Sequence, residues 1–117
     1  MMRLFETYRP QAVAHLAAMA NVRYSIGRAP LYTHVNVTGS VNLLEAAYRH
    51  GVRSFVFAST SSIYGNTTVL PFIETDPCNH PLSAYPATKK AIEVMGYSYH
   101  NLHGLSFTAV RFFSVYG

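Results

Sequence analysis

The chain has 117 residues, of which half are apolar and 12% are charged, and its formal net charge is +4. A sequence of this length and composition is at most one globular unit and is too apolar to be disordered. The nine basic residues are scattered, and Lys89-Lys90 is their only adjacent pair. The sequence therefore predicts no nucleic-acid partner.

Membrane, disulfide and metal chemistry are not expected either. No apolar run approaches the ~20 residues of a membrane-spanning helix, and the first residues lack the apolar centre of a signal peptide. The single cysteine, Cys78, cannot form an internal disulfide, which predicts a reducing, cytoplasmic location. The six histidines show no paired metal-ligand spacing, so we expect no metal site.

Helices and strands alternate along the predicted chain. In order, we expect a helix over residues 3–9, then over 12–18 a short strand that runs into a small-residue turn. A helix over 31–50, a strand over 54–58, a loop over 66–83, a helix over 83–102 and a strand over 107–112 follow. Gly51 and Gly104 are placed as C-caps of the two longer helices. Continuously apolar strands alternating with helices are typical of a parallel sheet covered on both faces.

These elements predict an α/β fold of the doubly wound, Rossmann type. Three strands and two full helices are too few for a complete sheet of that kind. We therefore expect residues 1–117 to be a single fragment, the middle portion of a larger domain.

Tyr85 and Lys89 carry the first indication of chemistry. Residues four apart share a face of a helix, so the two side chains point the same way. A neighbouring ammonium favours the phenolate form of a tyrosine, which predicts a proton-transfer group. Pro86 is tolerated in the first turn of a helix, so Tyr85 is expected near the helix start. The alternative is a solvated pair on an amphipathic helix.

All three strands end in residues suited to binding, and ligands of parallel sheets lie at the carboxyl ends of the strands. The first strand ends in small residues, which would let a flat ring or a diphosphate approach the backbone, although tight packing also explains them. The second ends in a run of four hydroxyls, a composition also found in turns. The third ends in Phe113-Ser114.

Together these segments resemble the extended short-chain dehydrogenase/reductase family, in particular its nucleotide-sugar epimerases and dehydratases. The matching segments occur in the family's order and spacing and span essentially the whole chain. They are His15–Ala18, Asn36–Gly39 with Asn42–Ala47, Ser59–Gly65, Tyr85-x-x-x-Lys89 and Arg111–Gly117.

The resemblance implies that Thr60, Tyr85 and Lys89 form a catalytic set and that NAD is the cofactor. Thr60 takes its place because it lies four residues before Tyr64 of the Tyr-Gly pair. Tyr85 would remove a proton from a sugar hydroxyl as hydride passes to NAD, and Thr60 would donate to the same oxygen. The implied cofactor-binding residues are Leu16, Ala17, Ala18, Met19, Asn36, Tyr85, Lys89 and Phe113.

The residues after Thr60 favour an epimerase. Dehydratases of the family place an Asp-Glu pair there, whereas this chain has Ser61-Ser62. A neutral hydroxyl cluster suits a sugar carboxylate. Residues 21–26 and 88–91 also most resemble the UDP-glucuronate 4-epimerases of the family. The resemblance therefore implies UDP-glucuronate as the substrate, interconverted with UDP-galacturonate through a transient keto-sugar. A UDP-glucose/UDP-galactose 4-epimerase or another nucleotide-sugar enzyme of the family is the alternative. The predicted substrate-binding residues are Arg23, Thr60, Ser61, Ser62 and Ser114.

One departure from the family is large. The Gly-x-x-Gly-x-x-Gly turn that holds the NAD pyrophosphate does not occur in this sequence. We therefore expect the chain alone to be inactive. Because the helices equivalent to 31–50 and 84–102 pack against a second subunit in relatives, the resemblance implies that the full-length protein is a homodimer. A truncated, non-catalytic product that acts only by association is the alternative of a different class.

Overall fold

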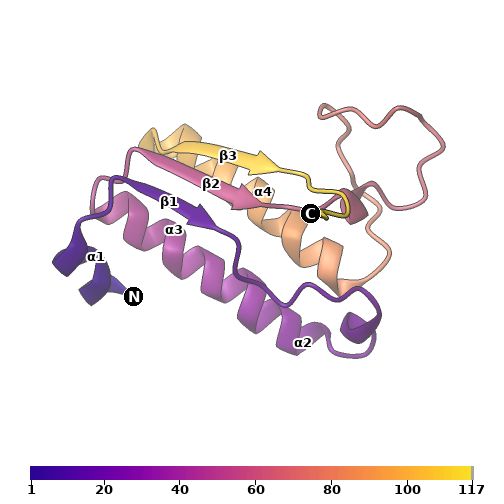
Figure 1. Cartoon of the computed structure of the whole chain (residues 1–117), viewed down its shortest axis with the longest axis horizontal. Helices are drawn as coiled ribbons and strands as arrows, with labels where there is room; N and C mark the ends of the chain where they lie inside the picture. The colour runs from indigo at the N-terminus through magenta and orange to yellow at the C-terminus, as the bar shows by residue number, and fades with distance from the viewer. Residues whose placement is uncertain (117) are drawn as a thin grey trace.

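A three-stranded parallel sheet in the order β1-β2-β3 organises the chain (Figure 1). The computed structural model describes residues 1–116, so Gly117, the last residue of the matched Arg111–Gly117 segment, lies outside the described residues. The strands are β1 Ala12–His15, β2 Ser54–Ala58 and β3 Ser106–Val110. Their parallel order confirms the predicted partial Rossmann-type α/β fold.

Two long helical segments connect the strands. The helical elements are α1 Met2–Tyr8, the 3-10 turn η1 Arg23–Ser25, α2 Ala29–Tyr32, the π-helical segment η2 Thr33–Thr38, α3 Gly39–Arg49, the 3-10 turn η3 Ser61–Tyr64 and α4 Ala84–His103. Gly104 ends α4 with φ 68°, a left-handed conformation that glycine adopts without strain. The helices predicted over 31–50 and 83–102 are therefore confirmed to within about two residues.

Two details differ from the prediction. The first strand ends at His15, and the small residues 16–18, which were predicted at its end, follow it without a ladder partner. The helix predicted over 31–50 is not uniform, because residues 33–38 adopt π-helical hydrogen bonding. Such segments are rare and are frequent at functional sites.

Within residues 1–116, helices cover one face of the sheet, whereas the sequence pattern predicted cover on both faces. In the parallel register, Ala14, Val56 and Thr108 lie side by side, and all three are exposed, Val56 to 38%. The reason is the handedness of the crossovers. Both connections step in the same direction along the sheet, and right-handed crossovers of that kind place α3 and α4 on the same side (Figure 1).

The core lies between that covered face and the two helices. Phe55 and Phe57 of β2 are fully buried there, against Leu44 of α3 and Ile92 of α4. Gly96 allows α4 its close approach, since a Cβ at this position would lie 2.2 Å from the Phe107 ring of β3. The packing of α4 on β2 and β3 fixes the position of its first turn at the carboxyl ends of the strands.

Within residues 1–116, no helix is long and apolar enough to cross a membrane. The same residues contain no cluster of three histidine, cysteine, aspartate or glutamate side chains that could hold a metal ion.

Candidate active site

A cavity of about 400 Å³ opens where the three strands end and α4 begins. It brings together five residues that the sequence predicted to be catalytic or cofactor-binding, from four separate segments: Leu16, Thr60, Tyr85, Lys89 and Phe113. The other lining residues are Ala20, Ala58, Ser59, Phe112 and Val115. The cavity thus has apolar walls and a small polar group of hydroxyl, phenol and amine side chains.

Lys89 supplies the buried charge of this cavity. Its side chain is only 3% exposed, and its Nζ donates a hydrogen bond of 2.8 Å to the carbonyl oxygen of Ala58. Burial lowers the pKa of Lys89 to about 8. The pKa of His15 is lowered mainly by the burial of its own ring and secondly by the positive charge of Lys89. The His15 ring forms a 2.7 Å hydrogen bond with Ser40. A lysine held in this way can change its charge near neutral pH.

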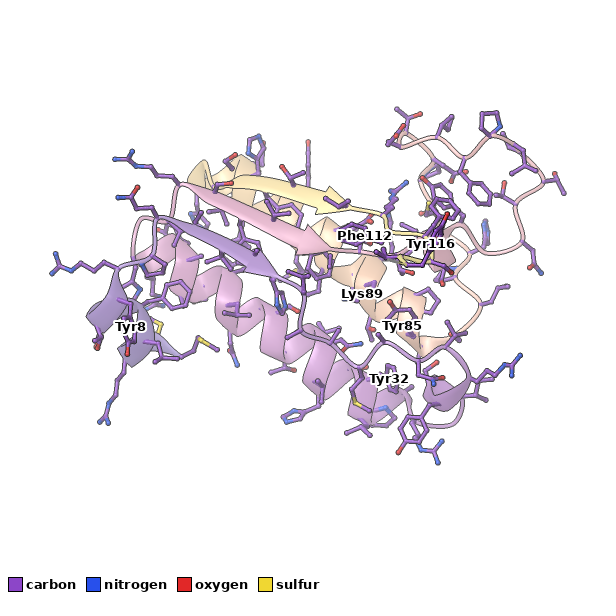
Figure 2. The ribbon with its side chains drawn as sticks, in the orientation of Figure 1. Tyr8, Tyr32, Tyr85, Lys89, Phe112 and Tyr116 are labelled. Atoms are coloured by element: carbon purple, nitrogen blue, oxygen red, sulfur yellow. The ribbon has the colours of Figure 1, made fainter. Side chains whose placement is uncertain are left out.

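Tyr85 lies in the first turn of α4, as Pro86 predicted. Figure 2 shows Tyr85 and Lys89 on neighbouring turns of α4, with Phe112 on the segment that follows β3. Tyr85 is 8% exposed and lines the cavity, and its carbonyl oxygen accepts a 2.8 Å hydrogen bond from Thr88. The backbone of the first turn is therefore held in place by its own helix.

Thr60 has a local task besides lining the cavity. Its Oγ1 accepts a 3.2 Å hydrogen bond from the Ser62 amide and so caps the 3-10 turn η3. The hydroxyl proton is not consumed by this bond, because a hydroxyl accepts and donates independently. Thr60 can therefore cap η3 and donate into the cavity at the same time.

Asn36 is buried and ties the loop after β1 to α4. Its Oδ1 accepts from the Met19 amide at 2.8 Å, and its Nδ2 donates to the Met19 carbonyl at 3.0 Å and to Thr88 at 3.1 Å. Both amide protons of Asn36 are thus used within the chain. Asn36 is the buried residue of the π-helical segment η2.

The remaining predicted residues lie outside the lining of the cavity. Arg23 is exposed on η1, and Ser114 is exposed on the segment after β3. Ser61 and Ser62 begin η3 directly after Thr60 and are half-buried. The backbone amide of Ser61 donates to the Phe112 carbonyl at 2.8 Å. Ala17, Ala18 and Met19 follow Leu16 without lining the cavity themselves.

Glu93 and Arg111 were missed as contributors to this region. Glu93 Oε2 forms ion pairs with Lys90 Nζ at 3.4 Å and with Arg111 Nη2 at 3.0 Å. Glu93 Oε1 accepts a hydrogen bond of 2.6 Å from Ser59 Oγ. Burial raises the pKa of Glu93, but the hydrogen bonds from Arg111 and Ser59 outweigh it and hold the pKa below its ordinary value. The spacing of Glu93 four residues after Lys89 placed it on the same helix face and could have indicated it.

Doubly wound parallel sheets bind dinucleotides at the carboxyl ends of their strands, which is where Thr60, Tyr85 and Lys89 lie buried. The family model described as "NAD dependent epimerase/dehydratase family" matches residues 1–117. The chain therefore belongs to this family of NAD-dependent nucleotide-sugar enzymes, as the sequence resemblance predicted.

Three known proteins illustrate the relationship. The chain is 49% identical over 114 residues to a UDP-glucuronate 4-epimerase of Thermodesulfobacterium geofontis, covering 97% of this chain and 35% of the relative. It superposes on a Thermotoga maritima UDP-glucose 4-epimerase solved with UDP-glucose, with a TM-score of 0.93 and 37% identity, covering 99% of this chain and 38% of that one. A Thermus thermophilus UDP-glucose 4-epimerase solved with NAD gives a TM-score of 0.87 and 38% identity, with coverages of 94% and 36%. The chain thus spans about a third of the length of these proteins.

Proposed function

We propose that the chain carries the catalytic centre of an NAD-dependent nucleotide-sugar 4-epimerase that interconverts UDP-glucuronate and UDP-galacturonate. The observation that carries this proposal is the convergence of Thr60, Tyr85 and Lys89 on one cavity of about 400 Å³. These three side chains come from the end of β2 and the first two turns of α4.

The residues around the cavity fit a nicotinamide riboside. Leu16, Phe112 and Phe113 offer apolar surface to a flat ring, and the Lys89 ammonium has two further N–H groups besides the one bound to Ala58. Those N–H groups suit ribose hydroxyls. When bound, NAD supplies the acceptor for a hydride from the sugar.

The chain's own residues would manage the proton of the sugar's 4-hydroxyl. Tyr85 Oη, as phenolate, takes that proton while the C4–H bond breaks, and the Lys89 ammonium stabilises the phenolate through its charge. The Thr60 hydroxyl donates to the same sugar oxygen. After the keto-sugar has turned over, Tyr85 returns the proton as the C4–H bond forms on the other face.

Two features support UDP-glucuronate as the substrate. Ser61 and Ser62 follow Thr60 on η3, so the turn beside the site has neutral hydroxyls and no carboxylate. A sugar carboxylate meets no like charge there. In addition, the 49% identical relative is a UDP-glucuronate 4-epimerase. The UDP-glucose 4-epimerases among the solved structures make UDP-glucose the competing substrate.

The test uses a graft, because the chain spans about a third of its relatives. Residues 1–117 replace the matching 114-residue segment of the T. geofontis epimerase, and we call the product the grafted enzyme. We expect the grafted enzyme to convert UDP-glucuronate to UDP-galacturonate in the presence of NAD. The conversion is measured by chromatographic separation of the two nucleotide sugars. UDP-glucose serves as the competing substrate in a parallel assay.

Tyr85→Phe tests the proposed base, because it removes only the phenol oxygen atom of Tyr85. It should lower kcat by about 10²- to 10⁴-fold, the usual contribution of a general base, with little change in unfolding temperature. A well-folded grafted enzyme that is inactive, or whose kcat is indifferent to Tyr85→Phe, would contradict the proposal. If the grafted enzyme prefers UDP-glucose, the proposed epimerase activity stands and the proposed substrate, UDP-glucuronate, is wrong.

The homodimer expected from the family resemblance stays a prediction. The outer face of α4 exposes Val94, Tyr97 and Leu102 to 57%, 69% and 70%, which is compatible with a helix-mediated interface. Size-exclusion chromatography with light scattering on the grafted enzyme measures its oligomeric state. The cytoplasmic location likewise remains a prediction.

A further inference from the structure

A buried carboxylate on α4 joins the ends of β2 and β3. Glu93 Oε1 accepts hydrogen bonds from Ser59 Oγ at 2.6 Å and from Arg111 Nε at 3.1 Å. Its Oε2 accepts from Arg111 Nη2 at 3.0 Å. We call Ser59, Glu93 and Arg111 the Glu93 clamp.

The clamp is a rigid and permanently charged arrangement. The side chains of Glu93 and Arg111 are only 9% and 14% exposed, and the two N–H groups of the guanidinium meet the two carboxylate oxygens as parallel hydrogen bonds. The hydrogen bond to Glu93 raises the pKa of Arg111 further above its ordinary value. Losing either partner would leave an uncompensated buried charge.

Each member of the clamp is adjacent to a part of the proposed active site. Ser59 directly precedes Thr60, and Glu93 lies one turn of α4 after Lys89. Arg111 precedes Phe112, which lines the cavity, although Arg111 itself does not. The clamp therefore connects three of the four segments that line the cavity. Ser59 lines the cavity as well, whereas Glu93 and Arg111 do not.

The same guanidinium also reaches the turn that follows Thr60. Arg111 Nη1 donates to Tyr64 Oη at 3.1 Å and to the Glu74 carbonyl at 3.2 Å. Tyr64 is the last residue of η3, the turn that Thr60 caps. Both ends of the Ser59–Tyr64 segment are thus bound to one arginine, either directly or through Glu93.

We propose that the Glu93 clamp sets the position of Thr60 relative to Tyr85 and Lys89, so that Ser59, Glu93 and Arg111 are positioning residues for the reaction proposed above. This inference rests on the proposed function for its catalytic consequence. A displacement of about 1 Å in a reacting group can cost about 10²-fold in rate, so a clamp beside the cavity can govern turnover.

The first test compares Arg111→Lys and Ser59→Ala in the grafted enzyme. Lysine keeps the charge of Arg111 but cannot donate in the parallel, two-fold geometry, and alanine removes one hydrogen bond to Glu93. We expect either change to lower kcat by about 10- to 100-fold, with KM for UDP-glucuronate within about threefold of the parent. Lys90→Met is the control, because Lys90 lies 3.4 Å from Glu93 at the rim of the clamp. It should leave kcat within about twofold.

The second test needs no turnover and uses the 117-residue chain itself. The titration of Lys89, followed by NMR of its side chain, is expected to have its midpoint near 8 in the parent. Arg111→Lys and Ser59→Ala leave the net charge unchanged. A midpoint that moves toward the ordinary value of 10.5 would therefore report water entering around the ammonium.

The two tests separate the two proposals. An inactive grafted enzyme in which the Lys89 midpoint still responds to Arg111→Lys contradicts the proposed function and supports the clamp. Unchanged kcat and an unchanged midpoint overturn the clamp, as does a fall in unfolding temperature alone. If Arg111→Lys fails to fold, Ser59→Ala decides the question, since it deletes a single oxygen atom.

Discussion

The ζ-nitrogen of Lys89 lies 2.8 Å from the carbonyl oxygen of Ala58 and 4.8 Å from the centre of the Phe57 ring. Both contacts come from the carboxyl end of β2, so the strand that delivers Thr60 also holds the ammonium of α4. The carbonyl dipole and the ring face partly replace the water that this charge loses. They do not replace it fully, since burial lowers the pKa of Lys89 to about 8.

The lowered pKa predicts an alkaline limit to catalysis. As pH rises through about 8, Lys89 loses its proton and with it the positive charge that the proposed mechanism requires beside Tyr85. We expect kcat/KM of the grafted enzyme to fall about tenfold per pH unit above that value. The measurement is a pH–rate profile from pH 6 to 10. Activity that stays level up to pH 10 would show that Lys89 keeps its proton or is not needed.

The same burial predicts that Lys89→Met stabilises the fold while abolishing activity. The folded chain releases the Lys89 proton near 8 and the unfolded chain near 10.5, so the parent gains stability between these values as pH rises. Below pH 8 the parent carries the full penalty, about 3 kcal/mol at most. The advantage of Lys89→Met should therefore be largest at pH 7 and smaller at pH 10, by urea unfolding. An advantage that grows with pH would refute this account.

Thr60 offers a prediction that separates its two tasks. Thr60→Val removes the hydroxyl oxygen that caps the Ser62 amide. It also removes the hydroxyl proton that the proposed mechanism donates to the sugar oxygen. Loss of the cap should cost about 1 kcal/mol of unfolding free energy. Loss of the donor should lower kcat by about 10²-fold. Thr60→Ser keeps the hydroxyl and should retain most of both quantities. Equal activity of the two variants would remove Thr60 from the proposed mechanism.

Local patterns of the sequence were sufficient for the parts of the site that are local. Tyr85 and Lys89 share a helix face because they are four apart, and Gly104 ends that helix where its left-handed φ is needed. The run of four hydroxyl residues also begins directly after the end of β2, as predicted. These features depend only on spacings within one element and its neighbour.

Features that depend on distant segments were not predictable in this way. The exposure of Val56 follows from two crossovers that step in the same direction, which no single strand reveals. Asn36 hydrogen bonds both Met19 and Thr88, and Thr88 lies 52 residues away from it in the sequence. The π-helical backbone around Asn36 has no recognisable pattern in the sequence. Arg23 was placed by resemblance alone, and it is exposed outside the cavity.

Gly96 makes the close packing of α4 on β3 testable. A Cβ at this position would lie 2.2 Å from the Phe107 ring, so Gly96→Ala should cost about 1–3 kcal/mol of unfolding free energy. Gly39→Ala is the matched control, because a Cβ there meets nothing within 4 Å and its helical φ is −59°. It should be stabilising by up to about 1 kcal/mol. Gly96→Ala should also cost less when Phe107 is replaced by leucine. Equal effects of the two glycine substitutions would contradict the close contact.

The proposed preference for UDP-glucuronate depends on the neutral side chains of Ser61 and Ser62. Their backbone amides are used, Ser61 toward the Phe112 carbonyl and Ser62 toward Thr60, so side-chain changes should leave η3 intact. Ser61→Asp with Ser62→Glu places negative charge beside the expected sugar carboxylate. Two such charges about 4 Å apart repel by a few kcal/mol near a protein surface.

The grafted enzyme with both acidic substitutions should therefore lose at least about tenfold in kcat/KM for UDP-glucuronate relative to UDP-glucose. Ser61→Asn with Ser62→Gln has nearly the same shape without the charge and should keep the ratio of the parent. A salt titration adds a further check, because screening should recover part of the loss only in the acidic variant. A ratio that is the same in the parent, the amide variant and the acidic variant would mean that the carboxylate is recognised elsewhere.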